Sequence, residues 1–151
     1  IVAQSSEQAR RFWDLREDSG FYFSAFPQAP SFDVSLPPTL VDHYVAELAH
    51  RLRSIGSGYD AYVYGHIADG NLHIALATPG PLSPDIKHDV EDAVYAGITA
   101  CGGSFSAEHG VGLDKHRAYL EHADPGKQAL ARQFKTLLDP DGLFNPGKVP
   151  F

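Results

Sequence analysis

The dipeptide Asp69-Gly70 lies between two arms of alternating apolar and polar residues, in the stretch GYDAYVYGHIADGNLHIALATPG (58–80). Asp-Gly is favoured in type I′ turns, because both central residues of such a turn take positive φ. Alternation with a period of two is typical of half-buried strands. The sequence therefore predicts an antiparallel hairpin, and this hairpin decides which side chains share a face of a sheet.

A chain reversal centred between Asp69 and Gly70 would pair His66 directly with His73. The two Cβ atoms would then lie about 4.5–5.5 Å apart, which lets both rings reach one metal ion. On an uninterrupted strand these histidines, seven positions apart, would point to opposite faces. We therefore expect two neighbouring imidazoles on one face of the sheet.

The expected register separates the hairpin side chains into two sets. The polar set comprises Tyr62, Tyr64, His66, His73, Ala75 and Ala77, and the apolar set comprises Val63, Ile67, Leu72, Ile74 and Leu76. The apolar face is expected to lie under helices. The opposite face, with its small alanines, leaves room for a ligand or another domain.

The remaining elements predict an α+β fold. A strand at 31–36 is followed by a helix that starts near Pro38 and ends before Gly56; a second helix spans 84–101, and SFSAEHGVG (104–112) is expected as a short strand. This order gives a ferredoxin-like antiparallel sheet with helices on one face. A C-terminal segment of helix and loop completes it. Residues 1–30 are expected to be a lead-in segment and 31–151 the domain.

Composition narrows the classes of partner. Twelve Lys and Arg stand against 19 Asp and Glu, and the net charge of -7 comes with no basic stripe, so we expect no nucleic-acid partner. No apolar run approaches the ~20 residues of a transmembrane helix, and nothing resembles a signal peptide. A soluble, cytoplasmic chain is expected, with peripheral membrane contact through another domain left open. The only cysteine, Cys101, allows no internal disulfide.

A third metal ligand is expected from Glu108 in SAEHG, with His109 beside an open coordination position. Neighbouring residues of a strand face opposite ways, so Glu108 and His109 can share one site only if the strand breaks there. Gly110 and Gly112 make such a break plausible. The alternatives stay open: an exposed polar histidine pair, a solvated Glu108 and His109, and an Asn71 that serves only the turn.

Three motifs in this order resemble the C-terminal part of the FAD-linked oxidases: GHIADGNLH (65–73), CGGSFSAEHGVGLDKHRAYL (101–120) and LLDPDGLFNPGKV (137–149). That family includes D-lactate dehydrogenase, the glycolate oxidase flavin subunit and D-2-hydroxyglutarate dehydrogenase. The segments WDLRE and FDVSLP extend the resemblance over nearly the whole chain.

The resemblance implies a cap over an FAD that is held mainly by an N-terminal flavin-binding domain missing from this chain. It also implies a divalent metal ion, often zinc, bound by the residues that match His66, His73 and Glu108, with His109 as the base. Arg16 matches the arginine that holds the substrate carboxylate. Asn71 is a candidate substrate contact and Asn145 a candidate flavin contact.

The reaction implied is oxidation of a small D-2-hydroxy acid to a 2-oxo acid, with the α-hydrogen delivered as hydride to flavin and a neutral His accepting the hydroxyl proton. The electron acceptor is not specified by the sequence. Two other hypotheses remain: a stand-alone metal-dependent hydrolase or lyase that uses the same His, His and Glu set, and a non-catalytic remnant.

Overall fold

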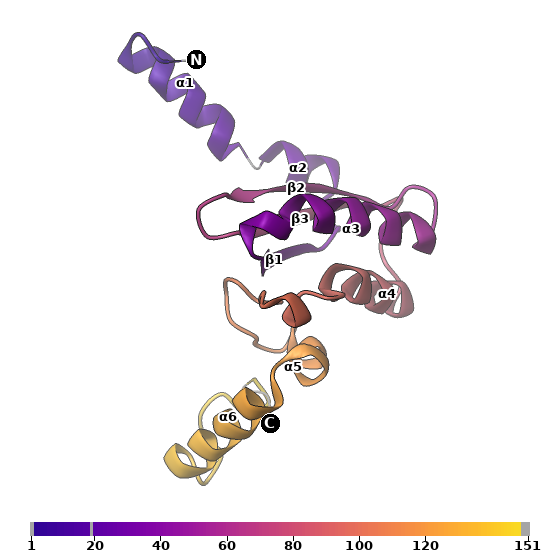
Figure 1. Ribbon diagram of the computed structural model, residues 1–151, viewed down its shortest axis with the longest axis vertical. Helices are drawn as coiled ribbons and strands as arrows, with labels where there is room; N and C mark the ends of the chain where they lie inside the picture. The colour runs from indigo at the N-terminus through magenta and orange to yellow at the C-terminus, as the bar shows by residue number, and fades with distance from the viewer. Residues whose placement is uncertain (1, 19, 149–151) are drawn as a thin grey trace.

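The computed structural model describes residues 2–18 and 20–148. The elements in chain order are α1 (Ser6–Glu17), α2 (Gly20–Ala25), β1 (Ser31–Ser35), the 3-10 helix η1 (Pro38–Leu40), α3 (Val41–Ile55), β2 (Asp60–His66), β3 (Asn71–Ala77), α4 (Pro84–Tyr95), the 3-10 helix η2 (Thr99–Cys101), α5 (His116–His122) and α6 (Pro125–Leu138). In Figure 1, α1 and α6 project from opposite ends of a body built around the sheet. Within the described ranges no helix is both long and apolar enough to span a membrane.

The sheet has three antiparallel strands in the order β1-β3-β2. Beyond β1, Ser35 and Ser104 form an isolated bridge with backbone hydrogen bonds of 2.9 Å in both directions. The antiparallel sheet and the helices packed on it confirm the predicted α+β class. The bridge stands where the fourth strand of a split βαβ fold would lie. The strand expected within 104–112 is reduced to that bridge, because the Ser106 hydroxyl bonds the carbonyls of Glu108 and Gly110 and curls the chain away.

The apolar face of the sheet packs against α3 and α4, as expected. Buried side chains from both layers form the core, among them Val34, Leu36, Leu48, Leu52, Leu72, Ile74, Leu76, Val90, Val94 and Ile98. The alternation of the strands and the helical spacing of α3 and α4 explain why these residues converge. The second helix is shorter than the predicted 84–101: it ends at Tyr95, because Gly97 takes a left-handed φ of 78° before the turn η2 begins.

The lead-in segment contributes two helices. The side chain of Ser5 caps α1 by accepting a hydrogen bond from the Gln8 N–H. Tyr22 of α2 donates a 2.6 Å hydrogen bond to the Leu76 carbonyl, and its ring lies 6.1 Å from that of Tyr62. The aromatic passage after α1 is therefore fixed against the hairpin, on the side of the sheet that α3 and α4 leave uncovered.

The hairpin register differs from the prediction by two positions. Tyr64 pairs with His73 and His66 with Asn71, so the predicted direct pairing of His66 with His73 is wrong. The loop has four residues, 67–70, and is closed by a 3.0 Å hydrogen bond from the Gly70 N–H to the His66 carbonyl. A shift by two keeps every strand residue on its predicted face. Ile67 is the exception, because it leaves the strand and is 91% exposed in the loop.

A contact outside the hairpin explains the shift. The Leu36 N–H donates a 3.0 Å hydrogen bond to the Gly70 carbonyl. Gly70 has a φ of 69°, and a Cβ there would lie 1.8 Å from the Leu36 carbonyl oxygen. The end of β1 thus holds the turn in place, and only glycine fits between them.

We expect Gly70→Ala to lower the free energy of unfolding by roughly 3 kcal/mol or more, because the new methyl group meets backbone at a strained φ. The control is Gly97→Ala: this glycine also has a positive φ, 78°, but a Cβ there meets no atom within 4 Å. The control should lose only about 1–2 kcal/mol. Equilibrium urea unfolding measures both, and equal losses would contradict the anchoring role of Leu36.

Candidate active site on the uncovered face of the sheet

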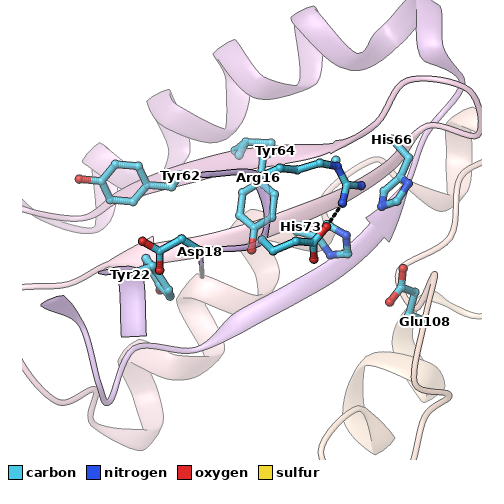
Figure 2. A pocket seen from close by; sticks show the side chains of 11 residues that line it. Arg16, Asp18, Tyr22, Tyr62, Tyr64, His66, His73 and Glu108 are labelled. Carbon is cyan, nitrogen blue, oxygen red and sulfur yellow. Dashed lines mark hydrogen bonds and ion pairs between the residues drawn. The ribbon is translucent and has the colours of Figure 1, made fainter. Parts of the chain in front are cut away.

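A cavity of about 770 Å³ lies on the face of the sheet opposite the core (Figure 2). Its walls come from the end of α1, from α2, from β2 and β3, and from the loop after the Ser104 bridge. The polar side chains that line it include Arg16, Asp18, Tyr22, Tyr62, Tyr64, His66, His73 and Glu108. Four of the predicted site residues, from distant parts of the chain, therefore line one cavity: Arg16, His66, His73 and Glu108. His109 is not among the lining residues.

The two hairpin histidines are neighbours, although along a diagonal. Their ring centroids lie 5.5 Å apart in an edge-to-face arrangement. Tyr64, which stands directly opposite His73 in the register, has its ring 5.3 Å from that of His73. The expected proximity of two imidazoles on one face is confirmed, and the cross-strand partner of His73 is a tyrosine.

Asp33 of β1 is a functional candidate that the sequence analysis missed. It stands opposite His73 in the β1–β3 register. Its Oδ1 lies 2.6 Å from His73 Nδ1 and its Oδ2 lies 3.0 Å from His109 Nδ1, so one carboxylate bridges both rings. The alternation of Phe32 and Val34 with polar neighbours, combined with the predicted hairpin faces, was the signal that could have found it.

The loop that carries Glu108 and His109 breaks as the shared site requires. His109 takes a left-handed φ of 62°, and Gly110 follows with 66°. Lys115 Nζ donates hydrogen bonds to Ser106 Oγ (3.0 Å) and to the Glu108 carbonyl (3.3 Å), and these two bonds hold the loop in place. Burial lowers the pKa of the Lys115 ammonium. Neighbouring carboxylates, among them Glu108, partly offset this effect.

Asn71 holds Glu108 in position. Its Nδ2 donates a 2.5 Å hydrogen bond to Glu108 Oε1, and the residue is only 8% exposed. It is not among the residues that line the cavity. The side chain of Asn71 therefore contacts a predicted metal ligand, while its backbone N–H donates to Asp69 Oδ1 in the turn (3.0 Å).

Arg16 and Asn145 lie in different surroundings. Arg16 lines the cavity, forms an ion pair with Glu17, and has its guanidinium carbon 5.2 Å from the centre of the Trp13 ring. Asn145 lies in the loop after α6 with a φ of 47°, and its carbonyl accepts a 3.1 Å hydrogen bond from the Lys148 N–H. It does not line the cavity.

The donor types at the site are those that a divalent ion accepts. Among the described residues, ligand atoms of Asp33, His73 and Glu108 lie within 4.8 Å of one another. This set contains two of the three predicted ligands, and the ring of the third, His66, adjoins His73. Imidazole nitrogens together with carboxylate oxygens are ordinary zinc ligands.

Comparison with known proteins places this chain in a family. The model of "FAD linked oxidases, C-terminal domain" matches residues 1–149. D-2-hydroxyglutarate dehydrogenase, mitochondrial, of Arabidopsis thaliana is 33% identical over 99% of this chain and 26% of that protein. The protein of the same name in Danio rerio is 33% identical over 98% and 27%. D-2-hydroxyglutarate dehydrogenase of Stutzerimonas stutzeri is 30% identical over 99% and 33%.

The chain spans about a quarter to a third of the length of these relatives. The family match, in contrast, covers all but the last two residues of the chain. The chain belongs to the FAD linked oxidases, as a C-terminal domain of that family.

Proposed function

We propose that this chain is the substrate-side domain of a longer FAD-dependent dehydrogenase that oxidises a D-2-hydroxy acid to a 2-oxo acid. The observation that carries the proposal is the convergence of His66, His73 and Glu108 with Arg16 in one cavity. The names of the relatives support this substrate class. The electron acceptor is outside the proposal.

We propose that the flavin is held mainly by protein outside this chain. The relatives are three to four times longer, which leaves length for another domain. Helix α6 also has no buried residue and exposes Leu130, Phe134 and Leu137, as a surface that packs on further protein would. When bound, FAD supplies the acceptor for the hydride. Asn145, in the loop after α6, is the proposed contact to it.

The proposed metal ion is zinc, held by His66, His73 and Glu108. The donor set fits, because the Asp33 carboxylate occupies Nδ1 of His73 and leaves Nε2 for a metal. Glu108 is held by Asn71 through Oε1. Its Oε2 lies 3.9 Å from Nε2 of His109, which is beyond hydrogen-bond distance, so both atoms can still take another partner. A divalent ion bound there would supply Lewis acidity, lowering the pKa of the substrate hydroxyl group and drawing its carboxylate into place.

His109 is the proposed base and Arg16 the proposed anchor of the substrate carboxylate. Nδ1 of His109 is bonded to Asp33, so Nε2 is the atom that accepts the hydroxyl proton. A guanidinium can bind a carboxylate through two parallel hydrogen bonds, and Arg16 reaches the cavity from the end of α1. The substrate carboxylate would replace that of Glu17 as the partner of this guanidinium.

We expect His73→Ala to weaken zinc binding by the purified chain by about 100-fold or more, since it removes a ligand. His66→Ala should also weaken it. The matched control is His50→Ala, on the exposed side of α3, which should bind zinc like the unmodified chain. Isothermal titration calorimetry and elemental analysis provide the measurement. Unchanged affinity in both site variants would rule out the assignment.

His109→Asn in the full-length protein should slow reduction of FAD by the D-2-hydroxy acid by about 10²–10⁴-fold, because proton removal loses its base. Stopped-flow absorbance of the flavin measures this step, and zinc content should not change. His43→Asn, exposed on α3, serves as the control. A His109→Asn protein that reduces its flavin at the normal rate would exclude this residue as the base.

Arg16→Gln should raise the KM for the hydroxy acid by about 10- to 100-fold, because a charge-assisted hydrogen bond contributes roughly 1.5–3 kcal/mol. Arg11→Gln is the control, since Arg11 is an exposed arginine of the same helix that pairs with Glu7. Steady-state kinetics of the full-length protein separates the two. The anchor would be refuted by equal KM values.

A further inference from the structure

We propose that Asp33 is a positioning residue: its carboxylate holds both His73 and His109 as Nδ1–H tautomers and so keeps Nε2 of each ring free for chemistry. The inference deepens the proposed function and rests on it for the meaning of the two histidines. It assigns Asp33 no bond to the metal or to the substrate.

The hydrogen-bond geometry carries the first step. Each oxygen of Asp33 faces one ring nitrogen, at 2.6 Å for His73 and 3.0 Å for His109. An ionised carboxylate can only accept hydrogen bonds, so both Nδ1 atoms must donate. A neutral imidazole has one N–H, and the lone pair of each ring therefore lies on Nε2.

The short distance between Asp33 Oδ1 and His73 Nδ1 argues against one metal ion that is bound by both of these atoms. Two ligand atoms at 2.0–2.2 Å from a tetrahedral ion lie roughly 3.3 Å apart. Asp33 Oδ1 and His73 Nδ1 are only 2.6 Å apart, which is a hydrogen-bond distance. A carboxylate bonded to the far nitrogen of a metal-bound histidine is instead the usual second contact that fixes the ring.

The surroundings of Asp33 hold its carboxylate in place. The side chain is only 17% exposed. The carbonyl of the same residue accepts a 3.0 Å hydrogen bond from the Ala107 N–H. Asp33 therefore connects β1 to the loop of His109 through its backbone and its side chain together.

Substitution by asparagine gives a specific signature. The amide introduced by Asp33→Asn would offer one acceptor and one donor group, so it can accept from only one Nδ1–H. The other ring must accept at Nδ1 and carry its proton on Nε2. One of the two histidines is therefore expected to change tautomer, with the shape of the side chain preserved.

The experiment uses long-range ¹H–¹⁵N correlation spectra of the metal-free chain, at a pH where both imidazoles are neutral. Both rings should be Nδ1–H in the unmodified chain, and one should become Nε2–H in Asp33→Asn. Asp42→Asn, exposed on α3, is the control and should leave both unchanged. Nε2–H rings in the unmodified chain, or two unchanged rings in Asp33→Asn, would overturn the proposal.

Zinc titration adds a second measurement. Asp33→Asn should bind zinc about 10- to 100-fold more weakly, as loss of an orienting partner does. In the zinc-loaded unmodified chain, the ¹⁵N shift of His73 should report coordination through Nε2; coordination through Nδ1 would refute the inference. A chain that binds no zinc would defeat the proposed metal site, and the tautomer spectra would still decide the role of Asp33.

Discussion

The hydrogen bond from the Leu36 N–H to the Gly70 carbonyl fixes the hairpin against β1, and the site geometry follows from that attachment. It extends the β1–β3 ladder, in which His73 stands directly opposite Asp33. It also holds the turn, and the turn sets the β2–β3 register, in which His73 stands opposite Tyr64. Sheets transmit such constraints well, because a slip by a single residue would move every side chain to the other face. A site on this framework has little freedom to rearrange.

The positive side chains near the site do not fully offset its negative ones. Asp33 and Glu108 each contribute a carboxylate, while Lys115 is half-buried below them and Arg16 is paired with Glu17. A divalent cation would offset the two carboxylates and add attraction for an anionic substrate. The electrostatics and the donor types therefore favour the same kind of occupant.

The sequence predicted the faces of the hairpin correctly and its register incorrectly, for a physical reason. Faces depend on a period of two, which is local to each strand, whereas the register depends on where the turn forms. Asp69-Gly70 predicts a two-residue turn, but Gly70 is held by Leu36, far along the chain, and a four-residue loop results. Asp33 was missed similarly, because its importance arises from pairing with His73 and not from its own segment.

The site has two parts: the first lies on strands and the second on a loop. His66, His73 and Asp33 lie on strands, so the sheet sets the positions of the two histidines that are proposed metal ligands. Glu108 and His109 lie on a loop whose left-handed residues no strand would tolerate, and the loop is held by local hydrogen bonds from Ser106 and Lys115. Asp33 belongs to the first part and binds the second. Through two hydrogen bonds, this one carboxylate fixes the ring of His73, the proposed metal ligand, relative to the ring of His109, the proposed base.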